Sequence, residues 1–430
     1  MTIPDKVLHR QAALLVETIA DVRRAVAAGH PADATLSHLY RQHPEFGSRD
    51  RHLLSGTVFS VFRWLGWLTP ERAPDEATAC VLAHLLDADA LHPAIALLLP
   101  QTKLDAAALR PMGGLDLKAR ASALAVVTGT AIPDLTDLVP AWALERIGVP
   151  ARRPAAPFRE RLTGSFQTAP PTWLRLPVGT GAKALDALRA AGLAAVAHPQ
   201  LPDAIRVDRG ANLWGLPKDI SRTLDIQDLA SQAVGHICAP QPRSRWWDVC
   251  AGSGGKALHL AMLMKNRGTI LATDVRESIL AQFERRKREA GLRLVELRRW
   301  DGLTEPAPEG PFDGILLDAP CSGLGTWHRN PDARWRTTDE RVTELARTQA
   351  ALLAACAPRL VPGGTLVYAT CTLTAAENHG VLDAFLAAHP DFAQSPFPNP
   401  LNGVPCDGRL TIFPWEGPCN GMFIARLTRA

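Results

Sequence analysis

From Arg245 to the last residue, short apolar stretches alternate with segments of helical periodicity, and this alternation restricts the fold more than any other feature of the sequence. Strands that alternate with helices are typical of a doubly wound α/β domain built on a parallel sheet. The stretches are predicted to form five parallel strands and a terminal hairpin, at residues 246–250, 269–274, 293–297, 312–318 and 365–370, and at 410–413 with 422–427. Residues 236–430 are therefore predicted to form one α/β domain.

The first 145 residues carry a different pattern, that of an all-helical domain. A helix is predicted over residues 5–28, where Gly29 ends it. A second helix follows the Gly47-Ser48 breaker, because apolar residues recur there at steps of three and four. These residues are Leu53, Leu54, Val58, Val61, Phe62, Leu65 and Leu68.

Prolines and arginines at residues 151–157 mark the end of the helical region, and they suit an exposed linker, predicted over residues 146–157. The stretch 158–235 is predicted to be a small α+β module, with strands at 172–176 and 204–207 and a helix at 182–191. Three domains are consistent with 430 residues, because this length exceeds what one hydrophobic core usually organises.

The composition excludes several classes of protein. The chain is 47% hydrophobic and 21% charged, as is usual for globular proteins, and no stretch approaches the roughly 18 apolar residues of a membrane helix. The first apolar cluster, residues 12–16, is too short for a signal peptide, so a cytoplasmic protein is expected. Eight cysteines without a C-x-x-C pair favour reduced thiols over a disulfide framework or a metal site. The net charge of +4 permits a polyanionic partner without identifying it.

A glycine-rich turn follows the first strand of the α/β domain, and a helix is expected from Ala257. Glycines let the backbone approach a ligand closely, and the amino terminus of a helix offers free N–H donors. The turn reads Asp248-Val249-Cys250-Ala251-Gly252-Ser253-Gly254-Gly255-Lys256. Because its spacing differs from G-x-G-x-x-G, a dinucleotide oxidoreductase is disfavoured. A tight turn that needs glycine only for its backbone angles is the alternative interpretation.

Acidic residues follow the next strands. Asp274 ends the second strand, where a carboxylate can accept both hydroxyls of a ribose. Asp301 follows the third strand and Asp318 ends the fourth. Each acid alone could be a capping residue, but four consecutive strands end in a glycine turn or an acid at the edge where doubly wound sheets bind ligands.

Two cysteines follow the fourth and fifth strands. Cys321 lies in Asp318-Ala319-Pro320-Cys321-Ser322-Gly323, and Cys371 lies in Tyr368-Ala369-Thr370-Cys371-Thr372. A helix over 338–360 between them predicts a right-handed crossover, which places the strands side by side at roughly 4.8 Å. Both thiols are then expected to face one pocket, although two small apolar filler residues remain the alternative.

These strings resemble the motifs of the NOP2/Sun family of RNA cytosine-5 methyltransferases: residues 248–256, residues 318–323, and Thr370-Cys371-Thr372 with Glu377-Asn378. Residues 236–430 resemble the Rossmann-like, S-adenosylmethionine-dependent catalytic domain, and residues 225–232 the segment that leads into it. The string Arg49-Asp50-Arg51-His52-Leu53-Leu54 is similar to the NusB-type RNA-binding domain of the bacterial Sun branch, which methylates small-subunit ribosomal RNA. The middle module corresponds to the RRM-like insertion of that branch.

The resemblance assigns roles to residues. It implies that Cys371 is the nucleophile and that Cys321 assists release; in the DNA cytosine-5 enzymes the Pro-Cys cysteine attacks instead, and spacing alone cannot choose between the two. Asp318 is implied to contact the cytosine edge, with Lys256 as a candidate to orient it, while Asp274 holds the cofactor ribose and Asp301 the adenine amine. The implied S-adenosylmethionine pocket comprises Cys250, Ala251, Gly252, Ser253, Gly254, Gly255, Lys256, Asp274, Asp301 and Asp318.

The chain departs from the family pattern in two places. Gly252-Ser253 stands where Ala-Pro is common, and Asn420 stands where Asp is common before Gly421. Further candidate RNA contacts are a basic run, Arg285, Arg286, Lys287 and Arg288, although such a run is most often a solvated face. The residues after Cys321, namely Trp327, His328, Arg329 and Trp335, could also stack on or bind RNA, and local packing explains them equally well.

Two rival functions remain for the same sequence, besides the dinucleotide oxidoreductase that the glycine spacing disfavours. A transfer RNA cytosine-5 methyltransferase would use the same residues on another RNA. A non-catalytic RNA-binding assembly factor would keep the fold without the chemistry, and the intact Cys321, Cys371 and Asp318 weigh against it. An RNA partner, S-adenosylmethionine as cofactor and no metal or membrane are therefore expected.

Overall fold

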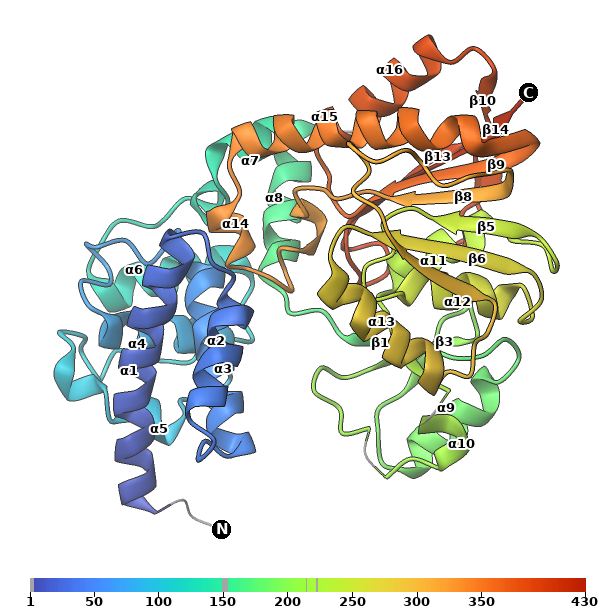
Figure 1. Ribbon diagram of the computed structural model, residues 1–430. Helices are drawn as coiled ribbons and strands as arrows, with labels where there is room; N and C mark the ends of the chain where they lie inside the picture. Colours follow the sequence, from blue (N-terminus) through green and yellow to red (C-terminus); the bar gives the residue numbers. More distant parts are fainter. Residues whose placement is uncertain (1–3, 149–153, 214, 222) are drawn as a thin grey trace. The chain divides into compact units, whose positions relative to one another are not determined.

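The computed structural model describes residues 4–148, 154–213, 215–221 and 223–430 in two compact units (Figure 1). The first unit is Met1–Thr168 with Trp327–Thr338, and the second is Ala169–Thr326 with Asp339–Ala430. The break falls at Thr168 and not in the predicted linker over 146–157, of which residues 149–153 lie outside the described residues. The division into three functional domains stays a prediction.

The first unit is helical, as predicted from the apolar periodicity. Its α-helices are α1 (Asp5–Ala27), α2 (Ala32–Gln42), α3 (Ser48–Trp64), α4 (Glu76–Asp87), α5 (Pro93–Ala96), α6 (Leu117–Thr128), α7 (Ala141–Arg146), α8 (Ala155–Phe166) and α14 (Ala333–Arg336). Short 3₁₀ turns cover Leu99–Gln101 and Leu135–Leu138. The linker prediction is wrong from Ala155 onward. Pro154 is the N-cap of α8 and Pro157 lies in its first turn, where a missing N–H removes no intrahelical hydrogen bond.

The core of the first unit forms where α1, α3 and α4 pack together. On α1 the residues Leu15, Ile19, Val22 and Val26 are buried, at the three- and four-residue steps of one helix face. The α3 residues that the periodicity selected follow the same rule, because Leu54, Val58, Val61 and Phe62 are all buried.

A segment that leaves the α/β region and returns to it completes the first unit. Trp327 and Arg334 are fully buried there. The Arg334 guanidinium donates hydrogen bonds to the carbonyl oxygens of Leu138 (2.5 Å), Arg63 (3.3 Å) and Phe166 (3.3 Å). The chain after Cys321 is therefore anchored in the core of the helical unit.

The second unit begins with a four-stranded antiparallel sheet of order β2-β3-β1-β4. Its elements follow the β-α-β-β-α-β order of ferredoxin-like modules. They are β1 (Thr172–Arg175), α9 (Gly181–Ala190), β2 (Val196–Ala197), β3 (Ala204–Val207), α10 (Lys218–Ser221) and β4 (Asp225–Ile226). The predicted α+β module is thus present, although α8, placed in it from residue 158, belongs to the first unit.

A larger mixed sheet has the order β10-β14-β9-β8-β5-β6-β7, with β13 paired to β14. Its strands are β5 (Arg245–Asp248), β6 (Thr269–Asp274), β7 (Val295–Arg299), β8 (Phe312–Asp318), β9 (Leu360–Thr370), β10 (Phe392–Gln394), β13 (Arg409–Ile412) and β14 (Met422–Arg429). A separate two-stranded pair is formed by β11 (Phe397–Pro398) and β12 (Pro405–Cys406).

Helices cover both faces of this sheet (Figure 1). They are α11 (Leu229–Cys238), α12 (Gly255–Leu263), α13 (Glu277–Glu289), α15 (Asp339–Cys356) and α16 (Val381–Ala388), with 3₁₀ turns at Leu324–Thr326 and Ala357–Arg359 and a π-helical turn at Ala376–Gly380. Adjacent residues of β5 enter opposite cores, Trp246 on one face and Trp247 on the other, so the strand is buried on both sides.

The five central strands, β9, β8, β5, β6 and β7, are parallel, and the terminal hairpin pairs as predicted. The predicted Rossmann-like α/β fold is therefore confirmed. The third strand lies two residues later than predicted, and β9 begins at Leu360 because that residue already pairs with Phe312 ahead of a bulge. The carboxyl ends of all five strands meet at one edge.

Candidate active site

The glycine-rich turn between β5 and α12 is a cradle of unusual backbone angles. Gly252 has φ of +54° and Gly254 has φ of +89°, a region that residues with a side chain rarely adopt. A Cβ atom on Gly254 would lie 2.2 Å from the Phe283 ring, whereas one on Gly252 would meet no atom within 4 Å. The turn is therefore packed on its inner side and open on the side of Gly252.

Asp274, at the end of β6, is tied to this turn. Its carboxylate accepts a hydrogen bond from the Gly252 N–H (2.9 Å) and three from Arg276, namely from the backbone N–H (2.9 Å) and from two guanidinium nitrogens (3.0 Å each). Burial by itself would raise the pKa of Asp274, but these hydrogen bonds hold the pKa below its ordinary value. Asp274 is thus an ionised acceptor next to the cradle.

Asp248, at the end of β5, carries a signal that the sequence reasoning did not use. Its side chain is fully buried, and neither oxygen has a well-aligned hydrogen bond from a described residue, although the Ala257 backbone N–H lies close enough to lower the pKa of this carboxyl. Burial and the neighbouring Asp318 charge raise the pKa of Asp248 to about 8. An orphaned buried carboxyl beside an open glycine cradle fits a ligand that brings its own donors or positive charge.

Arg286, from the predicted basic run, connects the cradle to the small sheet. One of its guanidinium nitrogens donates to the Ser253 carbonyl oxygen (2.7 Å) and hydroxyl (3.1 Å), and the other donates to both carboxylate oxygens of Asp225 (2.8 Å each). Asp225 also pairs with the buried Arg175 at 2.8 Å. Ser253, one of the departures from the family pattern, is therefore held by contacts that a proline could make only in part.

Asp301 caps its own loop. One carboxylate oxygen accepts hydrogen bonds from the backbone N–H groups of Leu303 (3.1 Å), Thr304 (3.0 Å) and Glu305 (3.0 Å), and the other accepts the Thr304 hydroxyl. These hydrogen bonds lower the pKa of Asp301. The local geometry explains this acid as a turn cap without any ligand.

The two cysteines meet as the crossover predicted. β8 and β9 are parallel neighbours, with Asp318 opposite Ala369, and the two sulfur atoms lie 3.3 Å apart. Cys321 and Cys371 are both partly exposed, and both are free thiols. Two adjacent strand ends thus present both sulfurs at one point of the sheet edge.

Lys256 joins the cysteines to the cradle. Its ammonium lies 2.5 Å from a carboxylate oxygen of Asp318. Burial works against its charge, yet Asp318, Cys371 and Asp248 together raise the pKa of Lys256 above its ordinary value. The Cys321 thiol, in contrast, has a pKa raised well above the usual range by its hydrogen bond to Cys371, by burial and by the Cys371, Glu377 and Asp318 charges. The surroundings of the two thiols therefore differ.

The other departure, Asn420, lies next to the segment that leads into the domain. Its backbone N–H donates to both oxygens of the Asp228 carboxylate at 3.1 Å, and Asp228 also caps α11 through the Ala230 N–H. This contact uses the backbone of residue 420, so it is available to Asn and to Asp alike.

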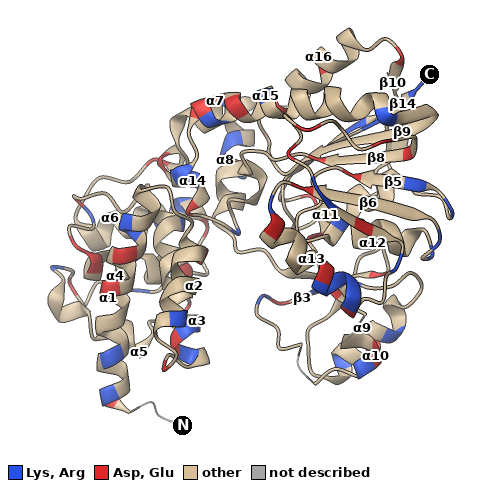
Figure 2. Cartoon of the chain, viewed as in Figure 1, with Lys and Arg blue, Asp and Glu red and all other residues tan. Residues whose placement is uncertain are grey.

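Most of the further candidate RNA contacts have structural partners. Trp327 and His328 are buried in the first unit, and the Trp335 ring nitrogen donates to the Phe62 carbonyl oxygen at 2.7 Å. On α13 the basic side chains gather near the carboxyl end (Figure 2), where Lys287 pairs with Glu284 at 2.7 Å. Local packing therefore accounts for Trp327, His328 and Trp335.

In the first unit, the string that resembles a NusB-type motif is partly structural. Asp50 accepts hydrogen bonds from Arg10 (2.9 Å), Gln11 (2.8 Å) and the Gly47 N–H (3.3 Å), which caps α3. Arg51 donates to the Phe46 carbonyl oxygen at 2.8 Å. Arg49 and His52 remain exposed.

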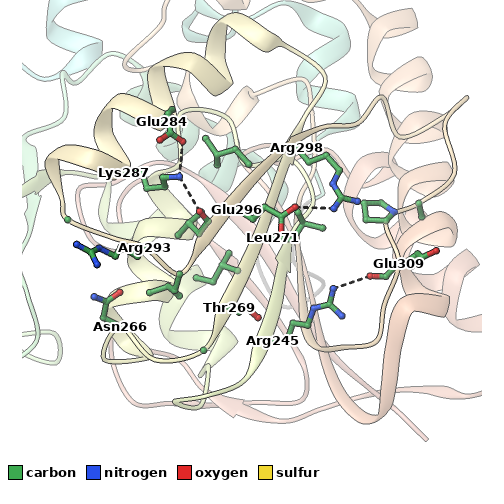
Figure 3. A pocket seen from close by; sticks show the side chains of 18 of the residues that line it. Arg245, Asn266, Thr269, Leu271, Glu284, Lys287, Arg293, Glu296, Arg298 and Glu309 are labelled. Carbon is green, nitrogen blue, oxygen red and sulfur yellow. Dashed lines mark hydrogen bonds and ion pairs between the residues drawn. The ribbon is translucent and has the colours of Figure 1, made fainter.

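A cavity of about 1510 Å³ lies along β7 and the amino ends of β5 and β6, the opposite edge from the cysteines (Figure 3). Its charged side chains are largely neutralised within the wall: Lys287 by Glu284 at 2.7 Å, and Arg298 by Glu296 at 3.0 Å. Ligands of doubly wound sheets bind at the carboxyl ends of the strands, so this cavity is separate from the candidate active site.

Comparisons with known proteins agree with this geometry. The model of the 16S rRNA methyltransferase RsmB/F family matches residues 236–428. The ribosomal RNA small subunit methyltransferase B of Salmonella typhi is 34% identical over 304 residues, which are 70% of this chain and 68% of the relative. The chain belongs to the RsmB/F family. The resemblance to NOP2/Sun methyltransferases is thereby confirmed.

Further similar proteins support membership of the RsmB/F family. The probable ribosomal RNA small subunit methyltransferase B of Synechocystis sp. is 38% identical over 282 residues, 63% of each chain. A methyltransferase homolog protein from Pyrococcus horikoshii has a solved structure with a TM-score of 0.56 and 25% identity, covering 67% of this chain and 94% of that one. The solved structure of PH0851 has a TM-score of 0.75 at 22% identity over 100% of both chains, which shows the fold alone.

Membership of the RsmB/F family identifies S-adenosylmethionine as the methyl donor. The open glycine cradle, the ionised Asp274 and the orphaned Asp248 fit this cofactor, which carries a ribose, an ammonium group and a positive sulfonium. In the part of the chain that the structure describes, no helix is long and apolar enough to cross a membrane.

Proposed function

We propose that this chain methylates carbon 5 of a cytosine in RNA, in small-subunit ribosomal RNA, through a covalent adduct with Cys371. The observation that carries the proposal is the 3.3 Å approach of the Cys321 and Cys371 sulfurs beside the Lys256–Asp318 pair. Two thiols, a carboxylate and a buried ammonium thus stand together at the strand ends that border the cofactor cradle.

A cysteine is required because carbon 5 of cytosine is a poor nucleophile. Addition of a thiolate to carbon 6 turns the ring into an enamine, which can attack an electrophilic carbon. Bound S-adenosylmethionine supplies that electrophilic methyl group. An unperturbed thiol is only a few per cent thiolate at neutral pH, so the attacking cysteine needs a nearby positive charge.

The surroundings of the thiols favour Cys371 as the nucleophile. Lys256 interacts electrostatically with Cys371, so this sulfur has a cation among its neighbours. Cys321 has the raised pKa and faces Glu377 and Asp318, so it retains its proton. The Cys321 S–H can then donate a hydrogen bond to the Cys371 sulfur, both before attack and when that sulfur leaves.

Asp318 is proposed to contact the N3 and amine edge of the cytosine, oriented by its 2.5 Å pair with Lys256. After methyl transfer the carbon 5 proton departs to a base, the bond from carbon 6 to sulfur breaks, and the Cys321 thiol stabilises the departing Cys371 thiolate. A base stacked in a duplex does not expose carbon 6, so the target cytosine must be unpaired or flipped out.

The cofactor assignments stand as proposals. Asp274 would accept the ribose hydroxyls in place of the exposed Arg276 guanidinium. The cradle, Cys250 to Lys256, would present to the methionyl part those backbone N–H groups that Ala251, Gly252 and Gly254 do not already use for hydrogen bonds within the protein. Asp301 would reach the adenine amine only with the lone pairs that its turn cap leaves free. The Asp248 carboxyl would accept the cofactor ammonium.

Ribosomal RNA is the proposed substrate because both named relatives are ribosomal RNA small subunit methyltransferases. Such a substrate implies action in the cytoplasm. The helical first unit, with Arg49 and His52 exposed on α3, and the four-stranded module would contact the RNA around the target.

The test is transfer of labelled methyl from S-adenosylmethionine to unmodified small-subunit ribosomal RNA, with transfer RNA in parallel. Cys371→Ala should abolish 5-methylcytosine formation, Cys321→Ala should accumulate a denaturation-stable protein–RNA adduct, and Cys406→Ala should behave as the parent chain. An adduct that requires Cys321 would reverse the two roles. If only transfer RNA is methylated, the proposed substrate is wrong and transfer RNA takes its place. If the chain binds no S-adenosylmethionine, a non-catalytic assembly factor is favoured.

A further inference from the structure

Glu377 is a fully buried acid whose part in the proposed chemistry is so far limited to its charge beside Cys321. It lies in the π-helical turn Ala376–Gly380, a local irregularity often found at functional sites. One carboxylate oxygen accepts the Ser322 N–H (2.8 Å) and the Gln349 side-chain amide (2.9 Å); the other accepts the Thr374 hydroxyl (2.8 Å) and the Ser322 hydroxyl. Because all four partners donate, Glu377 acts as an acceptor-only carboxylate.

These hydrogen bonds hold the loop of Cys321. Ser322, which donates twice, is the residue directly after Cys321, and Gln349 also donates to the Pro320 carbonyl oxygen directly before it, at 2.9 Å. The backbone on both sides of Cys321 is thus connected to the Glu377 carboxylate within two hydrogen bonds.

The next residue, Asn378, holds the loop of Cys371. Its side-chain oxygen accepts the Thr370 hydroxyl at 2.6 Å, and its nitrogen donates to the Thr372 carbonyl oxygen at 3.0 Å. Two consecutive residues of one π-helical turn therefore each hydrogen-bond to one of the two cysteine loops. The loops are also joined directly, because the Ser322 and Thr372 hydroxyl oxygens lie 2.8 Å apart.

We propose that Glu377 is the positioning residue that makes the two cysteines unequal: it clamps the Cys321 loop to the Cys371 loop and places a buried negative charge beside Cys321. This inference deepens the proposed function and rests on it for its catalytic meaning. The clamp itself is a property of the folded chain without RNA or cofactor.

The charges around Cys321 agree with this inference. Cys371, Glu377, Asp318 and Tyr368 face the thiol, and the first three raise the pKa of Cys321 together with burial. Burial and the Cys321 and Glu377 charges raise the pKa of Tyr368 well above its usual range, so the phenol stays neutral. The positive charge near the pair belongs to Lys256, which interacts with Cys371.

The test separates charge from hydrogen bonding with two variants. Glu377→Gln keeps the shape of the side chain but removes its charge, whereas Ser322→Ala removes the hydroxyl that contacts Glu377 and Thr372 and leaves the charge and the backbone N–H in place. Both are made in the full chain with Cys371→Ser, so that iodoacetamide reports on Cys321. The alkylation rate at Cys321 is followed by peptide mass spectrometry from pH 6 to 11.

In the Glu377→Gln variant, the alkylation profile of Cys321 should move to lower pH by about one unit, which is the usual size of the effect of one nearby charge. Ser322→Ala should keep the profile within about 0.3 units of the parent, since the same charges remain. Coincident profiles for Glu377→Gln and the parent would overturn the charge assignment. If Glu377→Gln fails to fold, Glu377→Asp replaces it. This variant shortens the clamp but keeps the negative charge, so the pH profile of Cys321 alkylation should stay unchanged.

The clamp has a second readout in the chains that retain Cys371. Ser322→Ala should lower kcat for methyl transfer about tenfold or more and change KM for RNA less than about threefold, since loosened loops misplace the sulfurs but not the substrate. An unchanged kcat would overturn the clamp. If the parent chain forms no 5-methylcytosine, the proposed function fails, while the alkylation profiles still decide the charge assignment.

Discussion

The Gly325 N–H donates a 3.0 Å hydrogen bond to the Cys371 carbonyl oxygen, and the Gly325 carbonyl oxygen accepts the Gly421 N–H at 2.8 Å. The chain after Cys321 is thus laid directly against the backbone of the second cysteine and of the start of β14. A Cβ atom on Gly325 would lie 2.1 Å from the Gly421 oxygen and 2.8 Å from the Cys371 oxygen. This close approach is possible only for a residue without a side chain.

Gly325→Ala should therefore push the two cysteine loops apart and lower methyl transfer at least tenfold, because displacements of about 1 Å can cost a hundredfold in rate. Gly380→Ala is the matched control: the nearest atom to its new Cβ would be 3.4 Å away. Single-turnover methyl transfer measures both. Equal rates for the two variants would show that the close approach has no part in positioning the sulfurs.

The cofactor cradle makes a similar prediction for two adjacent glycines. Gly254 has φ of +89° and its Cβ would meet the Phe283 ring at 2.2 Å, whereas a Cβ on Gly255 would lie 3.6 Å from its nearest neighbour. Gly254→Ala should weaken S-adenosylmethionine binding by a factor of ten or more, about 1.4 kcal/mol, and more than Gly255→Ala does. Isothermal titration of both variants gives the ranking, and the reverse order would contradict the cradle geometry.

Asp248 predicts a pH dependence of stability. Its pKa, raised to about 8 by burial and by the Asp318 charge, lies above that of the unfolded chain. The neutral Asp248 carboxyl therefore contributes fully to the free energy of unfolding below the pKa that this group has in the unfolded chain. This contribution is lost as the pH rises towards 8, and the free energy of unfolding falls by up to about 1.4 kcal/mol per pH unit. Asp248→Asn, which cannot ionise, should remove this part of the decline.

Urea unfolding of the cofactor-free chain between pH 5 and pH 9 checks this prediction, with hydrogen exchange in β5 as the monitor of unfolding. The difference in unfolding free energy between the parent chain and Asp248→Asn should become less favourable to the parent as the pH rises. Parallel curves for the two chains would mean that Asp248 ionises as readily in the folded state as in the unfolded one.

The contact of Arg286 with Ser253 and Asp225 predicts coupling between the cradle and the small sheet. Arg286→Gln should weaken S-adenosylmethionine binding about three- to tenfold, because the turn loses two hydrogen bonds and its connection to Asp225. A double-mutant cycle with Ser253→Ala should give a coupling free energy of about 0.5–1 kcal/mol. Strictly additive effects on the dissociation constant would show that the Ser253 hydroxyl contributes nothing to the contact.

The sequence predicts the part of the site that depends on strand order. The β8–β9 crossover and the facing of Cys321 and Cys371 follow from apolar periodicity and the handedness of parallel connections, and both are present. The acids at the strand ends are predictable for the same reason.

What the sequence could not supply depends on contacts between distant segments. The pairing of Arg286 with Asp225 joins residues 61 positions apart, and a basic run alone cannot distinguish such a pair from a solvated face. The orphaned state of Asp248 and the clamp at Glu377 likewise depend on what does and does not surround a buried carboxyl. The segment Trp327–Thr338 follows the Cys321 loop in sequence but packs in the helical unit, which no periodicity indicates.

Arg334, in that segment, gives the last prediction. Its fully buried guanidinium has three carbonyl partners and the rings of Phe166 and Trp327, and burial together with the Arg63 charge lowers the pKa of Arg334 to about 9. Arg334→Met removes these three hydrogen bonds and should destabilise the helical unit by about 2–4 kcal/mol. Arg336→Met, on the same short helix but partly exposed, breaks its 3.2 Å ion pair with the buried Asp332 and should cost less than Arg334→Met does. Urea unfolding followed by hydrogen exchange in α3 measures both, and equal losses would mean that the segment is held by its apolar residues instead of by Arg334.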